Sequence, residues 1–474
     1  MKNLVIVLSL ANLLGEDRSF SFNGYTKFTH ISRLADYSII DIPYRMASLD
    51  IIHQSKNFSI NGNFTLEFQL KDDAHFLESK DPQDFRLDMR ELYVTYSGVN
   101  YEFRVGKQIH SWGNVDENSP VDNVSAMDYY YIFFVGIERK IGTMSAAFDY
   151  YIDDLKINAV FSPIHSTNRI PLGDDDFPIT LPIYPTQAQI FPIDALPFEG
   201  GVQGTYSFGL GDVSMSYFSG YDRVFNLTGV NVYGHGADLS FPFVDILFGY
   251  RKTNVLGVGG VLLNNWFVLR GDLGYFSTSD QNSSIDRQIS TNPVYYDSLH
   301  FSYPLLEKAD YLQSTIQLET ELPFNINFVA QYFNHDTLNY SAGSLPLDQD
   351  INIPNLTIDP EDMIPANFFT PGMGVPLALL TNRAAIITVD RWFMNEQLKF
   401  SITSMLDLGD YIGVSGITGS LTEYKIEYNI AQDLIGLIEL TKVMGSDAHP
   451  DGENYQFNKM EDFSHMRFEI KYIF

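Results

Sequence analysis

The chain of 474 residues contains no cysteine, which excludes thiolate catalysis, disulfide frameworks and Cys-ligated zinc or iron-sulfur sites. Basic residues are also few, because 30 Lys and Arg stand against 59 Asp and Glu, a formal net charge of -29. This balance excludes a general electrostatic affinity for nucleic acid or for anionic lipid headgroups. The hydrophobic content of 45% is ordinary for a soluble protein, so a membrane location has to be decided from the pattern.

The sequence also lacks an apolar run long enough to span a bilayer as a helix, which takes about 20 residues. The uncharged stretch 363–382 contains Pro365, Pro371 and Pro376, which would break a helix there. The apolar run 4–14 follows Lys2, precedes Gly15, and has the length of a signal-peptide core. We therefore expect residues 1–15 to be a signal peptide that exports the chain; the alternative is a buried N-terminal strand.

The C-terminal stretch 463–474 alternates between apolar and polar residues, which indicates a strand with two different faces. Its apolar positions are Met466, Phe468, Ile470, Tyr472 and Phe474. This pattern resembles the C-terminal barrel-assembly signal of Gram-negative outer-membrane β-barrels, which end on Phe. The resemblance implies a multi-pass β-barrel in the outer membrane, surrounded by lipid and lipopolysaccharide and inserted by the barrel-assembly machinery.

Alternation of this kind recurs along the chain and is cleanest over residues 58–71. A lipid-facing row opposed to a water-facing row is typical of a barrel strand. Comparable strands are predicted at 20–30, 86–96, 101–109, 266–276, 312–321, 325–333, 397–406 and 422–430, and less regular ones at 44–56, 141–151, 154–164, 200–208, 211–221, 384–394 and 434–444. Residues 230–262 fit either one long strand or an extra hairpin that turns at 241–243.

The connections alternate in length, which is typical of an outer-membrane barrel with short periplasmic turns and long extracellular loops. Short turns are predicted at 56–57, 97–100, 153–154, 209–211, 264–265, 323–324, 395–396 and 431–433, and long segments at 72–85, 111–138, 165–198, 278–308, 336–382 and 445–462. We predict an all-β fold: a single closed antiparallel transmembrane β-barrel over residues 16–474 with about 18 strands, within a range of 16–20. Strands begin soon after the signal, which leaves no plug of the kind found in TonB-dependent transporters.

The water-facing rows of the clean strands carry eight bases and eight acids, so the predicted lumen is close to neutral. Such a wall is either a network of ion pairs that stiffens the barrel or a two-signed lining that shapes solute selectivity. The predicted pore-lining residues are Lys27, Glu67, Lys71, Glu91, Glu102, Arg104, Gln108, Arg270, Asp272, Glu319, Lys399, Glu423, Lys425, Glu427, Arg467 and Glu469.

The acidity lies mainly in the predicted loops 72–85, 111–138 and 336–382, which we expect to be solvated. Carboxylate clusters also suit calcium, for which Asp174, Asp175 and Asp176 are weak candidates, with a second cluster at Asp447, Asp451 and Glu453. Their spacing fits no EF-hand loop, so no metal or cofactor is expected.

Residues 90–113 read as a hairpin with the motif Arg-Glu-x-Tyr, a turn, Arg-x-Gly-Lys-Gln and Ser-Trp-Gly. A turn centred on 98–99 would place Tyr93 opposite Arg104 and Glu91 opposite Gly106. The motif resembles porin-like barrels related to alginate-export proteins. That resemblance implies that the loop after Ser-Trp-Gly folds against the pore, with 129–134 as a lid in the barrel mouth; the alternative is an aromatic patch at the lipid interface.

The ten His residues belong to no recognisable catalytic motif, so we expect no enzyme. Our hypothesis is an outer-membrane porin-like channel for passive diffusion of small polar solutes, narrowed by loop 111–138 or 336–382. Alternatives are a channel for hydrophobic or saccharide solutes, to which the apolar stretch 363–380 points, and a surface adhesin or structural barrel. The balanced lumen departs from the basic pore of alginate exporters, and no oligomeric state is favoured.

Overall fold

The computed structural model describes residues 18–40, 42–69, 85–134, 138–171, 189–191, 193, 197–281, 284–287, 296–345, 364–409, 416–446 and 456–474. The predicted signal peptide, the lumen candidate Lys71 and both calcium candidates, Asp174 to Asp176 and the cluster at Asp447, Asp451 and Glu453, lie outside these residues. So does nearly all of the predicted loop 72–85.

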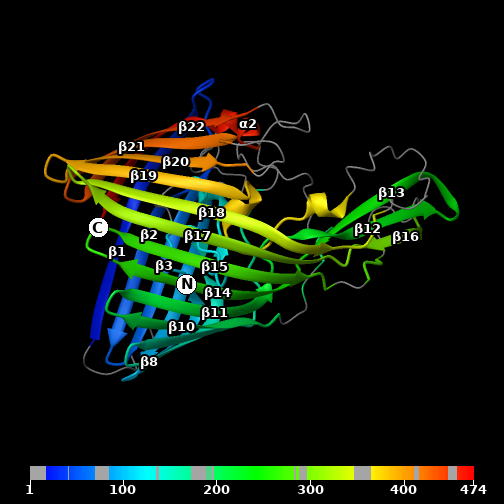
Figure 1. The fold of residues 1–474 in the computed structure, drawn as a ribbon, viewed down its shortest axis with the longest axis horizontal. Coiled ribbons are helices and arrows are strands. Elements are labelled where there is room, and N and C mark those ends of the chain that lie inside the picture. The colour runs from blue at the N-terminus through cyan, green and yellow to red at the C-terminus, as the bar shows by residue number, and fades with distance from the viewer. Residues whose placement is uncertain are drawn as a thin grey trace.

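Eighteen antiparallel strands form one sheet that closes on itself, because β1 pairs with both β2 and β23 (Figure 1). The strands are β1 (Arg18–Arg33), β2 (Pro43–Ser55), β3 (Phe58–Gln69), β4 (Phe85–Ser97), β5 (Tyr101–Gln108), β8 (Thr143–Ile152), β9 (Leu155–Ser162), β10 (Glu199–Phe208), β11 (Gly211–Tyr221), β14 (Lys252–Leu263), β15 (Val268–Ser279), β17 (Lys308–Leu322), β18 (Ile326–Ser341), β19 (Arg383–Phe393), β20 (Leu398–Asp407), β21 (Gly419–Ala431), β22 (Leu434–Gly445) and β23 (His465–Ile473).

The predicted barrel of about 18 strands is confirmed, and each predicted strand has its counterpart. The eight predicted short turns also connect the strand pairs assigned to them, so one rim carries short turns and the other carries long loops. In the parts of the chain that the structure describes, helix is confined to single turns such as η1 (Tyr129–Tyr131), η5 (Pro365–Phe368), η6 (Pro376–Leu379), η7 (Glu461–Phe463) and α2 (Gln456–Lys459). Within the described ranges, no helix has the length and apolar character to cross a membrane.

The outer face of the barrel is largely apolar, because exposed hydrophobic side chains recur at alternate positions along the strands, such as Val213, Met215 and Tyr217 on β11. Aromatic residues gather at the short-turn rim: Phe58, Tyr101, Tyr150, Tyr151, Tyr206, Phe208, Trp266, Phe324, Trp392, Phe393, Tyr428, Tyr472 and Phe474. An apolar band bordered by an aromatic girdle is the surface that a lipid bilayer requires.

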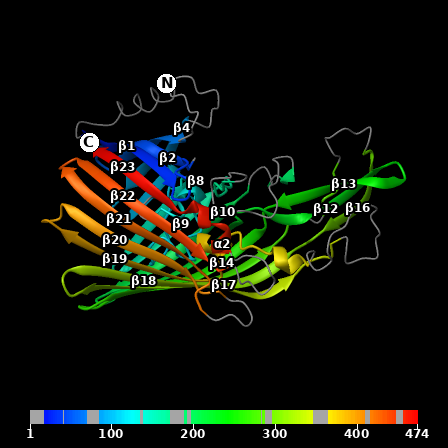
Figure 2. The same ribbon diagram turned by 90° about the horizontal axis from the view of Figure 1, so that it is seen from above.

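The region 226–249 forms the extra hairpin that the sequence left open, but the predicted turn at 241–243 is wrong. Strand β12 (Asn226–His235) turns at residues 236–237 into β13 (Asp238–Gly249), where Gly236 has a φ of 55°. Residues 241–243 lie inside β13. Pro242 is tolerated there because β13 is an edge strand, in which a missing backbone N–H costs little. With β16 (Ser298–Pro304) the hairpin forms a second sheet that projects from the long-loop end of the barrel (Figures 1 and 2).

The barrel closes where Gly24 on β1 meets the C-terminal residue. The Gly24 amide donates to the Phe474 carbonyl at 2.9 Å, and the Phe474 amide donates back at 3.0 Å. A Cβ on Gly24 would lie 2.2 Å from the Ser48 carbonyl oxygen and 3.0 Å from the Phe474 ring. The seam therefore needs glycine at this position because the backbones and the terminal ring approach closely.

We predict that Gly24→Ala destabilises the folded barrel by about 1–3 kcal/mol, the usual cost of overpacking. The control is Gly204→Ala on β10, whose added Cβ has nothing within 4 Å and which should unfold at or slightly above the wild-type urea concentration. The measurement is urea unfolding in detergent, followed by the gel mobility of folded and unfolded barrel. Equal midpoints for the two variants would show that the seam tolerates a side chain.

Candidate functional site

The connection between β5 and β8, residues 109–142, crosses the lumen instead of lying outside the barrel. Trp112 donates through Nε1 to Asn158 on β9 at 2.8 Å, close to where the loop leaves β5. Two residues later, the Asn114 amide donates to Asp272 on β15 at 2.7 Å. The Asn118 side chain reaches Gln331 on β18 at 2.8 Å. The loop is therefore attached to opposite parts of the wall, and it divides the interior.

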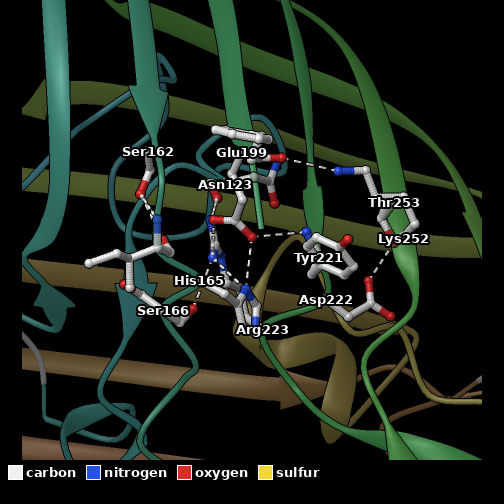
Figure 3. A network of polar contacts seen from close by, with 12 residues as sticks. Asn123, Ser162, His165, Ser166, Glu199, Tyr221, Asp222, Arg223, Lys252 and Thr253 are labelled. Atoms are coloured by element: carbon white, nitrogen blue, oxygen red, sulfur yellow. Dashed lines mark hydrogen bonds and ion pairs between the residues drawn. The ribbon is translucent and has the colours of Figure 1, made fainter. Parts of the chain in front are cut away.

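Arg223, in the connection after β11, anchors this loop from the other side (Figure 3). Its guanidinium donates to Glu199 at 2.8 Å, and to the carbonyls of Asn123 and Val124 at 3.2 and 3.1 Å. Figure 3 shows His165 beside this pair, with Nδ1 2.8 Å from Glu199. Because Arg223 and Glu199 are both buried, the pair holds the loop through charge that water does not screen.

A second connection, described over residues 364–382, is fixed at the same place. The Arg223 amide donates to the Gly372 carbonyl at 2.8 Å. The neighbouring Asp222 accepts from Arg251 at 2.6 Å, and Arg251 also pairs with Glu307 and donates to the Thr370 carbonyl at 2.5 Å. The acids on both sides of buried Arg251 raise its pKa, so this cation does not titrate.

The two connections share an apolar core at the long-loop end of the barrel. Tyr129, Tyr131 and Phe133 of the first loop are buried, as are Val375 and Leu377 of the second, and all five belong to one cluster. Phe134, the next residue in the first loop, packs on Phe463 beside β23 at a centroid distance of 6.5 Å. The lid interpretation of 129–134 therefore fits the structure, and the lipid-interface alternative is wrong.

Three of the five acids in the predicted loop 111–138 are paired, which corrects the expectation that this loop's acids are solvated, whereas Asp116 and Glu138 are exposed. Glu117 pairs with Arg139, Asp122 with Lys140 and Asp128 with Arg169 at 3.0 Å. Burial raises the pKa of Asp122 and of Asp128 against the opposing pull of their basic partners. The sequence did not reveal these partners, because Arg139 and Lys140 lie just after the predicted loop 111–138 and Arg169 lies in the next predicted loop.

Two cavities are lined in part by the crossing loop. One, of about 500 Å³, faces β17 to β21, and the other, of about 460 Å³, is lined mainly by the loop itself and by Arg270. Asp116, Glu117 and Arg139 line both. Glu117 adopts a left-handed backbone with a φ of 64°, which non-glycine residues seldom adopt without a structural or functional reason. The two cavities share these three side chains, and we call them the constriction.

Most predicted lumen residues occupy ion pairs along the wall. Six bases each have an acidic partner: Lys27 with Glu469, Arg104 with Glu102 and Asp149, Arg270 with Glu319, Lys399 with Asp390, Lys425 with Glu423, and Arg467 with Glu439. Glu67 pairs with Arg45 and Arg169, Asp272 binds the Asn114 side chain and backbone, and buried Gln108 donates to the Ser145 carbonyl. Glu427 is partly exposed inside its strand and enters neither cavity.

The predicted register of the hairpin between β4 and β5 is wrong by two residues. Gly98 donates to the Tyr101 carbonyl, so the turn is centred on 99–100, Tyr93 lies opposite Gly106, and Thr95 lies opposite Arg104. Glu91 and Arg104 are therefore not diagonal neighbours. Instead, Glu91 accepts from the Ile109 amide at 2.8 Å and fixes the point at which the crossing loop leaves β5.

Several functional residues were missed by reading only the cleanest strands. Asp149, Asp390 and Glu439 lie on strands whose alternation is less regular, and the parity along each strand would have placed them inside. Arg139, Arg223 and Arg251 lie in connections where periodicity carries no information. No group of three or more His, Asp or Glu side chains able to hold a metal ion is found in the described part of the chain.

Comparison with known proteins finds similar architectures but no family. No family model and no curated protein matches the chain. Among solved structures, Pseudomonas aeruginosa OccK2 (OpdF) is similar at 10% identity and a TM-score of 0.47, over 97% of this chain and 98% of that one. The outer membrane channel DcaP of Acinetobacter baumannii is similar at 10% identity and a TM-score of 0.41, over 96% and 97%.

The Vibrio cholerae outer membrane protein OmpT has 12% identity and a TM-score of 0.37, over 97% of this chain and 99% of that one. The relation to alginate-export proteins that the hairpin motif indicated stays a prediction. At these levels of similarity, the function has to be derived from the residues of this chain.

We predict that Arg223→Met frees the crossing loop, because it leaves Glu199 buried without its cation. Breaking such a buried pair destabilises the docked loop by about 3–5 kcal/mol. Amide hydrogen exchange should rise over residues 109–134 while the gel mobility of the folded barrel stays unchanged. The double variant Glu199→Gln/Arg223→Met should lose less of the docking free energy than the single variant, since no uncompensated charge remains. Unchanged exchange in the single variant would mean that the apolar core alone holds the loop.

We also predict that acid weakens the docking of the crossing loop through His110. Its Nε2 lies 2.8 Å from the Ser145 hydroxyl, and burial lowers its pKa from 6.5 to about 4, aided by Arg104 and Lys140 and opposed by Asp149. The docked loop thus holds a neutral imidazole, and its stability is fully present above pH 6.5. Below that pH, docking weakens by about 1.4 kcal/mol per unit until the folded pKa is reached.

The measurement for His110 is protease cleavage within 109–134 at pH 7.5, 6.0 and 5.0. Cleavage corrected for protease activity should rise with acid in the wild type and in an exposed-histidine control, His235→Gln, and should rise less in His110→Gln. If cleavage rises equally with acid in all three proteins, the loosening of the loop comes from protonation of carboxylates and not of His110.

Proposed function

We propose that this protein is an outer-membrane channel for passive diffusion of small polar solutes, narrowed by the loop 109–142. The observation that carries the proposal is the constriction: Asp116, Glu117 and Arg139 line both cavities inside a closed barrel. A barrel that served only as a scaffold would have no need for two lumen cavities that meet at charged side chains.

The polar lumen favours hydrophilic solutes over hydrophobic ones. Its wall carries ion pairs of both signs, which act on a passing solute without making the pore specific for anions. The apolar segment that motivated a hydrophobic-solute channel is instead packed: Val375, Leu377 and Leu380 are buried in the core shared by the two connections. That packing removes the main support for the hydrophobic alternative.

Export and insertion belong to the same proposal. The run 4–14 would act as the signal peptide, and the terminal strand with Phe468, Tyr472 and Phe474 would be the signal read by the barrel-assembly machinery. These three side chains are exposed on the outer face of β23 and at the chain end, where a partner strand or lipid can reach them. Lipid and lipopolysaccharide would cover the apolar band.

Surface attachment is the second candidate, and the projecting sheet favours it. Strands β12, β13 and β16 extend beyond the long-loop end of the barrel (Figure 2). Phe241, the fourth residue of β13, is 80% exposed. An exposed aromatic side chain on an element that extends beyond the barrel is accessible to a second surface. This sheet contributes no residue to either cavity, so attachment and conduction are compatible in one molecule.

We predict a small, steady ion conductance in planar bilayers, with selectivity set at the constriction. Arg139→Gln removes the one base that lines both cavities among the described residues and leaves Asp116 and Glu117 in place. A unit charge at about 4 Å contributes on the order of 1 kcal/mol even in water. Its removal favours a cation and disfavours an anion by about that amount each, so the ratio of cation to anion permeability should rise by up to about thirtyfold.

Reversal potentials under a salt gradient measure this ratio, and Lys399→Gln is the matched control because Lys399 pairs with Asp390 outside both cavities. The control should change the ratio less. An electrically silent wild-type barrel would sink the channel proposal and leave surface attachment by the projecting sheet as the better interpretation.

A further inference from the structure

The larger cavity has walls of two kinds. The apolar part of the lining is Phe133, Leu377, Ile386, Met405 and Leu421, which come from both lumen connections and from strands β19 to β21. The polar part includes the constriction and Thr388, Thr403 and Glu423, each two positions from one of these apolar residues on the same strand. A cavity of about 500 Å³ with an apolar wall and a few convergent polar groups has the size and character of a small-molecule site.

Most polar groups around this cavity already have partners within the protein. Gln317 donates to Asp116 at 2.7 Å and accepts from Gln331 at 2.7 Å. The hydroxyls of Thr388 and Thr403 bond to each other at 3.1 Å. These side chains therefore offer a ligand little that they do not already use.

Two buried acceptors are the exception. Oε2 of Glu423 and Oδ1 of Asn118 have no hydrogen-bond partner within the described part of the chain, although the two residues are only 1% and 3% exposed. Lys425 lies 3.3 Å from the other oxygen, Oε1 of Glu423. A buried acceptor without a donor costs about 1–3 kcal/mol, and more when it carries charge, so both oxygens call for a donor that the protein does not supply.

The charge of the lining indicates which donor fits. Asp116, Glu117 and Glu423 face the cavity with Arg139 as the one base among its lining residues, a balance of three acids to one base. Arg139 is itself occupied by Glu117. Glu423 is held by Lys425 through Oε1 only, and Asp116 lies 4.0 Å from Arg270. What the polar groups of the cavity lack is therefore a donor for Oε2 of Glu423 and Oδ1 of Asn118, while the apolar side chains accept an apolar body.

We propose that this cavity is a binding site for a small amphipathic cation, an alkyl- or arylammonium whose N–H groups donate to Glu423 and Asn118 and whose hydrocarbon lies on Leu377, Ile386 and Leu421. The inference rests on the proposed channel, since it names a class of solute for the same lumen. Affinity is modest, because a site within a pore must release its solute again.

The experiment is calorimetric titration of the full-length barrel in detergent with hexylammonium, hexanoate, hexanol and methylammonium. Hexylammonium should bind at least about tenfold more tightly than hexanoate, as a charge-assisted hydrogen bond of about 1.5–3 kcal/mol implies. Methylammonium should bind more weakly than hexylammonium, because each buried methylene contributes about 0.8 kcal/mol.

The variants assign the effect to residues. Glu423→Gln should weaken hexylammonium binding about tenfold, while Glu427→Gln, an acid four positions along the same strand and outside the cavity, should leave it unchanged. Ile386→Thr should weaken binding of hexylammonium and not of methylammonium. Gel mobility shows that each variant is folded.

Two results would overturn the inference: equal binding of hexylammonium and hexanoate by the wild type, or equal loss in the two glutamate variants. Conductance is measured separately on the same preparations. A barrel that conducts without preferring hexylammonium keeps the channel and loses the site, whereas a silent barrel that binds it keeps the site and loses the channel.

Discussion

The closed hydrogen-bond ladder is the constraint on which the rest of this structure depends. A strand in hydrocarbon has no water for its amides and carbonyls, so each must find a partner strand, and the first strand must meet the last. Here that meeting joins β1 to β23 and brings the chain end onto Gly24. Closure then fixes the side-chain parity of every strand, so one row faces outward as an apolar surface and the other turns its charges into the lumen.

The lumen enclosed by 18 strands must be filled by water or by protein, and here segments of two connections lie inside it. The two lumen connections carry an apolar core of their own, and buried arginines tie that core to the wall. Burying a charge is costly unless it is paired, and Arg223 and Arg251 have carboxylates together with backbone carbonyls as partners. Among the described residues, two cavities border the first connection and share the side chains of the constriction, so the fold of the loops shapes the interior as much as the diameter of the barrel does.

The sequence predicted well whatever follows from strand parity and turn chemistry. Alternation placed the strands, and the contrast between short and long connections gave their number and the two rims. It predicted poorly where the position of one hydrogen bond decides the outcome. The predicted β4–β5 register is off by two residues because the Gly98 amide bonds to the Tyr101 carbonyl. The predicted β12–β13 turn is misplaced because Gly236 takes the left-handed conformation. Loop partners such as Arg169 for Asp128 depend on contacts between distant segments, to which periodicity is blind.

The anchors also make the two lumen connections act together. The side chain of Arg223 holds carbonyls of the first connection, while its backbone amide holds Gly372 of the second. The preceding residue, Asp222, binds Arg251, which in turn binds the Thr370 carbonyl. Neither connection can leave the wall without disturbing a buried charge that the other also needs, and packed cores of this kind shift between discrete arrangements more readily than they deform continuously. Any change in the width of the path is therefore expected to involve both connections at once, with residues 222 and 223 as the point at which they are coupled.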